Sequence, residues 1–82
     1  MTAEKPTNDF RYDIVKKLAV LSTDTKGWTK EVNLISFNGQ DPVFDVRKWS
    51  PGGRMSRGIT LKQTEVAALI TALTEYQSEM EN

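Results

Sequence analysis

Two short runs of this chain, residues 28–37 and 43–49, place different kinds of side chain on alternate positions, and this feature constrains the fold most. A period of two residues is typical of β-strands, because successive side chains point to opposite faces of a sheet. One predicted face is apolar and consists of Val32, Leu34, Phe44 and Val46. The other predicted face mixes rings, a cation and polar groups, namely Asn33, Ile35, Phe37, Asp45, Arg47 and Trp49. The two runs therefore predict neighbouring strands with one buried face and one face of mixed chemistry.

Two further strands flank this pair. Apolar and β-branched residues favour a first strand from Phe10 or Tyr12 to Ser22, with a bulge or bend where Lys16-Lys17 interrupts the alternation. Asn38-Gly39 is typical of a tight turn, because both residues tolerate a positive φ. A short strand is expected at about 57–61. The order predicts an α+β fold with a four-stranded antiparallel sheet followed by one helix.

The C-terminal helix is predicted by apolar residues at helical spacing. These residues are Val66, Leu69, Ile70 and Leu73. We expect them to cover the apolar face of the sheet. Thr60 with Gln63 fits a capping box at the start of the helix, unless Leu61 between them belongs to the preceding strand and the helix starts a few residues away. A second stripe of Ala68, Ala72 and Tyr76 fits the same helix of a second copy, unless the alanines are present only for helix propensity.

Composition limits the classes of function. The chain has 82 residues with no cysteine and no histidine, which excludes a disulfide framework, a thiolate metal site and the usual neutral-pH general base. Asp41 and Asp45 lie at strand spacing near a loop, but nothing supplies the rest of a catalytic or metal site. We therefore expect no enzymatic activity, no metal, no cofactor and no small-molecule substrate. The lack of a long apolar run or signal-like N-terminus predicts a soluble intracellular protein without a membrane partner.

The formal net charge of zero hides a segregation of charge along the chain. Residues 1–60 contain ten Lys and Arg against seven Asp and Glu, whereas residues 61–82 contain one Lys against four Glu. The basic excess is sharpest at 41–60, around Trp49. This pattern permits an anionic ligand on the first part of the chain, although an ordinary surface of mixed charge is an equally good interpretation.

The face of mixed chemistry suggests a binding surface. If one helix covers the apolar face, then Ile35, Phe37 and Trp49 are exposed beside Arg47. Base rings stack on aromatic side chains while phosphates pair with cations, so this combination favours a nucleic-acid ligand. Two alternatives remain: a second subunit covers this face, or the chain is a protein–protein interaction module without a nucleic-acid ligand.

The order of these motifs resembles a known family. The segment 44–49, a Pro- and Gly-rich loop, the segment 56–61 and a helix are similar to the C-terminal domain of the transcriptional coactivator called positive cofactor four. Residues 32–39 resemble the second strand and turn of that family, and residues 27–34 are especially similar to its bacterial YdbC-like branch. The resemblance covers about residues 10–75.

The resemblance implies a homodimer joined through the C-terminal helix, with curved sheets that bind single-stranded DNA. Phe37 and Trp49 would be stacking rings, Arg47 a phosphate or base contact, and Arg57 a basic contact before a glycine. Ile35 and Trp28 stand where the eukaryotic domain has basic residues, which implies more stacking and less phosphate neutralisation.

The expected function is largely sequence-independent binding of single-stranded DNA in transcription regulation or DNA maintenance, and the sequence leaves open whether RNA is also a ligand. The expected domain spans 10–82 after a disordered lead at 1–9, and the expected location is cytoplasmic and nucleoid-associated. The expected nucleic-acid-binding residues are Trp28, Lys30, Asn33, Ile35, Phe37, Arg47, Trp49, Arg54 and Arg57.

Overall fold

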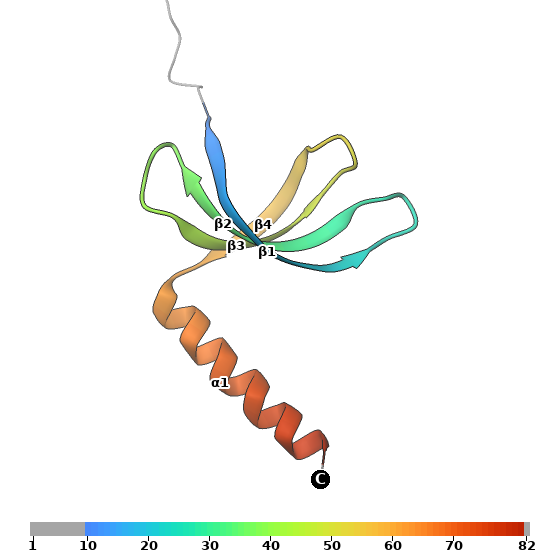
Figure 1. Ribbon diagram of the computed structural model, residues 1–82, viewed down its shortest axis with the longest axis vertical. Helices are drawn as coiled ribbons and strands as arrows, with labels where there is room; N and C mark the ends of the chain where they lie inside the picture. Colours follow the sequence, from blue (N-terminus) through green and yellow to red (C-terminus); the bar gives the residue numbers. More distant parts are fainter. Residues whose placement is uncertain (1–9, 82) are drawn as a thin grey trace, which may run out of the picture.

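The computed structural model describes residues 10–81 and confirms the predicted fold class. The elements in chain order are β1 (Tyr12–Thr23), β2 (Thr29–Phe37), β3 (Val43–Trp49), β4 (Met55–Leu61) and α1 (Gln63–Met80). The strands form one antiparallel sheet in the order β1-β2-β3-β4, so each strand pairs with its neighbours in sequence (Figure 1). The expected disordered lead at 1–9 lies outside the described residues.

The β2–β3 turn forms at Asn38-Gly39, where the sequence predicts it. Asn38 and Gly39 have φ angles of 52° and 76° in the β2–β3 connection, where a positive φ favours these two residue types. The Asn38 side chain also accepts a hydrogen bond from the Arg11 backbone at 3.0 Å, which ties the start of β1 to this turn. The predicted turn is confirmed, and it joins the start of β1 to the end of β2, where Tyr12 pairs with Phe37.

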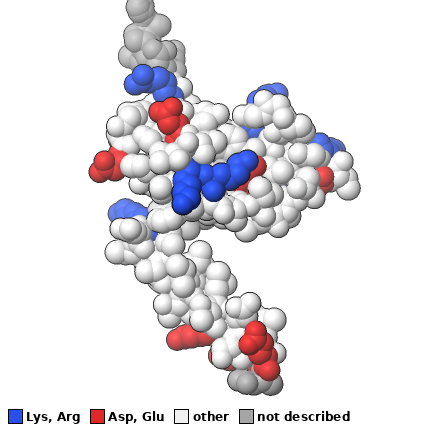
Figure 2. Space-filling view, viewed as in Figure 1, with Lys and Arg blue, Asp and Glu red and all other residues white. Residues whose placement is uncertain are grey.

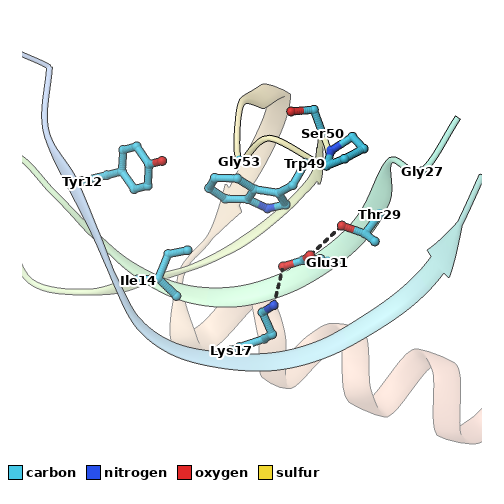
Figure 3. Close-up of a pocket in the computed structure, with 10 residues that line it drawn as sticks. Tyr12, Ile14, Lys17, Gly27, Thr29, Glu31, Trp49, Ser50 and Gly53 are labelled. Atoms are coloured by element: carbon cyan, nitrogen blue, oxygen red, sulfur yellow. Dashed lines mark hydrogen bonds and ion pairs between the residues drawn. The ribbon is translucent and has the colours of Figure 1, made fainter.

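Bulges in β1 curve the sheet. β1 has twelve residues against nine in β2, and its register shifts between Ile14 and Lys16, between Lys17 and Ala19, and between Val20 and Ser22. A bulge bends its strand and increases the local twist. The first two shifts flank the Lys16-Lys17 pair, so the predicted bulge is confirmed, and the repeated bulges give β1 the curvature seen in Figures 1 and 3.

The burial of the two faces is the reverse of the expectation. Figure 1 shows the hairpin loops rising on one side of the curved sheet while α1 leaves on the other, so the faces are concave and convex. Asn33 and Ile35 are fully buried on the concave face and Trp49 is only 6% exposed, so the prediction that this face exposes Ile35 and Trp49 is wrong. The curl of the sheet draws side chains of the concave face together, whereas Val32 and Phe44 on the convex face remain only half-buried.

The helix also differs from the expectation. α1 contacts only the two strands nearest its start and then extends away from the sheet, so it does not cover the apolar face (Figure 1). Val66 is half-buried, but Leu69, Ile70 and Leu73 are between 45% and 59% exposed. The radius of gyration is 16.4 Å, against about 12 Å for a compact domain of this length. An apolar helix face is therefore left uncovered within the single chain.

The helix begins later than the predicted capping box. Its N-cap is Lys62, whose backbone N–H donates to Glu65 Oε1 at 2.7 Å. Thr60 pairs with Asp45 as part of β4, so it is not available to cap the helix. The box at Thr60 and Gln63 is wrong because β4 extends through Leu61, which moves the helix start by two residues.

Candidate nucleic-acid interface

A row of four aromatic rings lies along the sheet. The ring centroids are 5.9 Å apart between Phe37 and Phe10, 6.1 Å between Phe10 and Tyr12, and 5.7 Å between Tyr12 and Trp49. All three pairs are tilted, as aromatic neighbours prefer to be. Phe10 is 58% exposed, and Phe37 and Tyr12 are half-buried, so the row presents rings to solvent. Sequence reasoning named Phe37 and Trp49 but missed Phe10 and Tyr12, whose two-residue spacing at the start of a strand was the available signal.

Arg47 is held by an ion pair beneath this row. Its Nε and Nη2 donate to the two carboxylate oxygens of Asp45 at 2.7 and 2.6 Å, and Asp45 is fully buried. Its Nη1 donates to the Met55 sulfur at 3.0 Å and the Ser56 carbonyl at 3.2 Å. The guanidinium carbon lies 5.5 Å from the centroid of the Phe37 ring. Arg47 therefore compensates Asp45 and supports Phe37, and only 12% of its side chain is exposed.

The backbones of β3 and β4 approach each other closely where Gly58 pairs with Arg47. A Cβ on Gly58 would lie 2.3 Å from the Arg47 Cβ and 2.6 Å from the Val46 carbonyl oxygen. No side chain fits there, since real Cβ atoms do not approach other atoms this closely. The glycine that follows Arg57 thus has a packing role: it leaves space for the arginine that binds Asp45.

A second buried carboxylate lies further along the same face. Glu31 Oε2 accepts a hydrogen bond from Thr29 Oγ1 at 2.6 Å, and Oε1 accepts one from Asn33 Nδ2 at 3.3 Å. The Lys17 ammonium lies 3.7 Å from Oε1. Burial tends to raise the pKa of Glu31, but these two hydrogen bonds and the Lys17 charge outweigh it, so the pKa is lowered. Glu31 is therefore an ionised hydrogen-bond acceptor at neutral pH.

A pocket of about 460 Å³ opens between the rings and Glu31. Its lining residues come from β1, β2, the end of β3 and two loops: Tyr12, Ile14, Lys17, Gly27, Thr29, Glu31, Trp49, Ser50, Pro51 and Gly53. Figure 3 shows the Glu31 carboxylate between the Trp49 indole and Lys17. Two buried polar atoms of residues 10–81, Trp49 Nε1 and Asn33 Oδ1, have no hydrogen-bond partner. The pocket thus combines aromatic walls with polar groups that are not all satisfied.

The two loops at this end of the sheet touch each other. Gly27 has a φ of 88°, and a Cβ there would lie 2.9 Å from Pro51 Cγ. Lys48 Nζ, near the end of β3, lies 3.3 Å from Asp24 Oδ2 in the β1–β2 loop. Burial tends to raise the pKa of Asp24, but hydrogen bonds from the Trp28 and Lys26 backbone and the ion pair with Lys48 lower it overall. These contacts fix the wall of the pocket.

The remaining predicted site residues are dispersed. Trp28 is half-buried in the β1–β2 loop, where its backbone N–H donates to Asp24. Lys30 is exposed and pairs with Lys48, so by strand alternation it lies on the face opposite Glu31. Arg54 is exposed in the β3–β4 loop and Arg57 is exposed on β4. The structure brings Asn33, Ile35, Phe37, Arg47 and Trp49 onto the concave face, but Lys30 does not join them.

Charge follows the division into sheet and helix. Figure 2 shows basic side chains over the sheet and at its junction with the helix, with acidic side chains among those over the sheet, whereas the far end of the helix is acidic. Residues 63–80 contain three Glu and no Lys or Arg. An anionic ligand would therefore be repelled less at the sheet than at the helix end.

Within residues 10–81, no group of three or more acidic side chains is placed to hold a metal ion. No helix in this part of the chain is long and apolar enough to cross a membrane.

The family profile described as Transcriptional Coactivator p15 (PC4) matches residues 25–72, which span β2, β3, β4 and the first half of α1. The chain belongs to the PC4 family. An uncharacterized protein of Treponema pallidum (strain Nichols) is 40% identical over 63 residues, which cover 76% of this chain and 74% of that protein. PC4 is a family of DNA-binding coactivator domains and not of enzymes. The matched segment contains Glu31, Phe37, Arg47 and Trp49, whereas Tyr12 lies outside it.

Proposed function

We propose that this protein binds single-stranded DNA on the concave face of its sheet, largely independently of sequence, and acts in transcription regulation or DNA maintenance at the nucleoid. The observation that supports this most is the row of Phe37, Phe10, Tyr12 and Trp49, with centroid spacings of 5.7 to 6.1 Å. Stacking on such rings contributes roughly 1–3 kcal/mol per base and requires unpaired bases. The row therefore favours a single strand over a duplex.

The charges of the concave face suggest how a strand would lie. Glu31 and Asp45 are buried there, and both occupy the face that carries the rings. Phosphates would be repelled by these carboxylates, whereas base edges can donate hydrogen bonds to them. We infer that bases point toward the concave face and phosphates lie outward, near exposed cations such as Arg54 in the β3–β4 loop.

We also propose that the active species is a homodimer. Within one chain, large apolar side chains of α1 are exposed, namely Leu69, Ile70, Leu73, Tyr76 and Met80. The convex face adds Ile59, which is 59% exposed. A two-fold pair of chains buries the same surface twice, which is the commonest solution for a small domain that cannot cover its own apolar groups. The helix thus supplies the dimer contact, and the concave face is left for DNA.

Titration of the tryptophan fluorescence with oligonucleotides tests the proposal. We expect oligo-thymidine to quench the signal of Trp28 and Trp49 and to bind more tightly than the matched duplex. Affinity should fall with salt at a slope of roughly −0.7 for each phosphate contacted. A matched RNA shows whether the 2′-hydroxyl is tolerated. Equal or tighter binding of the duplex would contradict the proposal.

The second candidate function is a protein–protein interaction module without a nucleic-acid ligand. The exposed apolar stripe of α1 is the observation that favours it. If no oligonucleotide binds while the chain is monomeric, this candidate replaces the first. Binding of oligo-thymidine by a dimer excludes it, because the stripe is then already covered.

A further inference from the structure

We propose that the Glu31 pocket receives one guanine base of the bound strand, and that Glu31 is the residue that selects it. This inference rests on the proposed function and deepens it. Binding along the aromatic row stays independent of sequence, and one position in the strand becomes selective. The ligand chemistry is a base edge with two adjacent N–H donors.

The Glu31 carboxylate has hydrogen-bond acceptor sites that its neighbours do not occupy. An ionised carboxylate has two acceptor sites on each oxygen. Thr29 occupies one site on Oε2 at 2.6 Å, and Asn33 occupies one on Oε1 at 3.3 Å. Lys17 lies 3.7 Å from Oε1, beyond hydrogen-bond distance, and its side chain is 59% exposed. One acceptor site therefore remains on each oxygen, although the side chain is only 9% exposed.

The hydrogen-bond donors of a bound base must match the free acceptor sites of Glu31. Two adjacent acceptors require two adjacent donors, and guanine presents them as N1–H and N2–H₂ on its Watson–Crick edge. Adenine, cytosine and thymine each place an acceptor next to their donor on that edge, and the acceptor would face a carboxylate oxygen. Single-stranded bases are read on this edge in proteins that bind unpaired nucleic acid. The free acceptor sites of Glu31 thus fit guanine better than any other standard base.

The pocket has the size and the aromatic walls that a base requires. The pocket of about 460 Å³ lies within the range of roughly 300–1,000 Å³ typical of small-ligand sites. Tyr12 and Trp49 line it, so the ring of a base can pack against an aromatic wall while its edge faces Glu31 (Figure 3). Trp49 also carries a buried donor, Nε1, that has no hydrogen-bond partner in the free chain.

The rest of the pocket supports an uncharged base and not a phosphate. Lys17 is the only cation among the lining residues, and its charge is offset by the Glu31 carboxylate 3.7 Å away. A phosphate placed near Glu31 would meet a negative charge, whereas guanine is neutral and donates hydrogen bonds. The charge of the pocket therefore favours the base over the backbone of the strand.

A series of 11-mer oligo-thymidines with one changed central base tests this inference on the full chain. The central base is thymine, guanine, adenine, cytosine or hypoxanthine, and hypoxanthine lacks only the N2 amino group of guanine. We expect the guanine strand to bind at least about fivefold more tightly than the others, as one good bidentate base contact would give. Hypoxanthine should lose most of that gain.

Variants identify the residue responsible. Glu31→Gln replaces one acceptor by a donor and should abolish the preference for guanine, while Glu79→Gln, the same change on the exposed helix, should retain it. The base series needs no variant, so it remains decisive if Glu31→Gln fails to fold. A free-nucleotide arm adds 5′-GMP or 5′-AMP to the complex. If millimolar GMP does not compete, the pocket binds guanine only as part of a strand, which supports the proposal. If GMP competes at concentrations near the Kd of the strand, a free nucleotide is sufficient, and that part of the proposal is overturned.

The outcomes separate the two proposals. Equal affinity for all five strands, with oligo-thymidine bound, overturns guanine selection and leaves the proposed function standing. A guanine preference that survives in a folded Glu31→Gln variant overturns the role of Glu31. If no strand binds at all, the proposed function fails together with the inference.

Discussion

The Tyr12 and Trp49 rings lie 5.7 Å apart, although their strands β1 and β3 are not neighbours in the sheet. Tyr12 pairs with Phe37 at the end of β2, whereas Trp49 pairs with Thr29 at its start. The two rings can meet only because the sheet curls and brings opposite corners of the β1–β3 layer together. Tyr12 thereby helps to cover Trp49, and the aromatic row becomes part of the core at one end and of the surface at the other.

Alanine substitutions at the two ends of the aromatic row should affect different properties, stability at one end and DNA binding at the other. Trp49 is 6% exposed, so we expect Trp49→Ala to lower the free energy of unfolding by about 3–5 kcal/mol, as large ring deletions in a core do. Phe10 is largely exposed and Phe37 is half-buried, so Phe37→Ala and Phe10→Ala should instead weaken binding of oligo-thymidine by about 1–3 kcal/mol for each base stacked. Chemical denaturation and fluorescence titration measure the two effects. Loss of DNA affinity in Trp49→Ala without loss of stability would contradict this division.

Alanine substitutions of the buried arginine and of the exposed arginines should have different effects. Arg47→Ala leaves the fully buried Asp45 without its ion pair and should destabilise the fold by about 3–5 kcal/mol. Arg54→Ala should leave the unfolding midpoint nearly unchanged, because Arg54 is exposed, and should reduce the salt slope by up to about one unit. Arg57→Ala is the exposed control, because Arg57 lies on the convex face with Ile59 and its removal should leave both quantities nearly unchanged. An unchanged midpoint in Arg47→Ala would show that its ion pair with Asp45 does not support the fold.

The strands could be predicted from the sequence, but the burial of their faces could not. Alternation assigns Ile35, Arg47 and Trp49 to one face of a sheet, and the structure confirms that assignment. It does not say whether that face is flat or curled, because curvature comes from bulges in a different strand, β1. The apparently open face is therefore the core. Alternation also places Glu31 on this face, but its pairing with Lys17 could not be predicted because Lys17 lies across a bulged register.

Stability should depend on pH through Glu31. The pKa of Glu31 is lowered in the folded chain from its ordinary value of 4.5, so the stabilisation is fully present above pH 4.5 and is lost as the pH falls through the lowered pKa. We expect the wild-type chain to be more stable than Glu31→Gln at pH 7, with the difference shrinking below pH 4.5. Denaturation of both proteins from pH 7 to pH 3 measures this. A difference that stays constant across that range would show that ionisation of Glu31 is not what stabilises the cluster.

Gly58 should tolerate no side chain. A Cβ there would lie 2.3 Å from Arg47 Cβ and 2.6 Å from a backbone oxygen, so β3 and β4 would have to separate. Gly58→Ala should therefore lower the unfolding midpoint, whereas Gly52→Ala should not, because the nearest atom to a Cβ at Gly52 is 3.9 Å away. Thermal unfolding of the two variants measures the contrast. Equal midpoints would indicate that the β3–β4 pairing can move apart at little cost.

The helix was predicted correctly as an element and wrongly in its packing. Periodicity identifies the apolar stripe of Leu69, Ile70 and Leu73, but it cannot say which surface the stripe meets. A stripe that covers its own sheet and one that meets a second chain have the same spacing. In this chain the direction of α1 is set at Lys62, directly after β4 ends, and it carries the stripe away from the sheet.

The exposed stripe of α1 predicts the state of assembly. We expect the wild-type chain to have about twice its chain mass of 9.3 kDa by light scattering at low micromolar concentration. Leu73→Glu places a charge in the stripe and should produce a monomer, because Leu73 is 59% exposed in the single chain and its burial must come from a partner. Thr74→Glu adds the same charge one position along the helix, outside the stripe, and should remain dimeric. A wild-type monomer that unfolds cooperatively would remove the dimer. A Leu73→Glu variant that stays dimeric would move the interface from this stripe to the convex face of the sheet, where Ile59 is equally exposed.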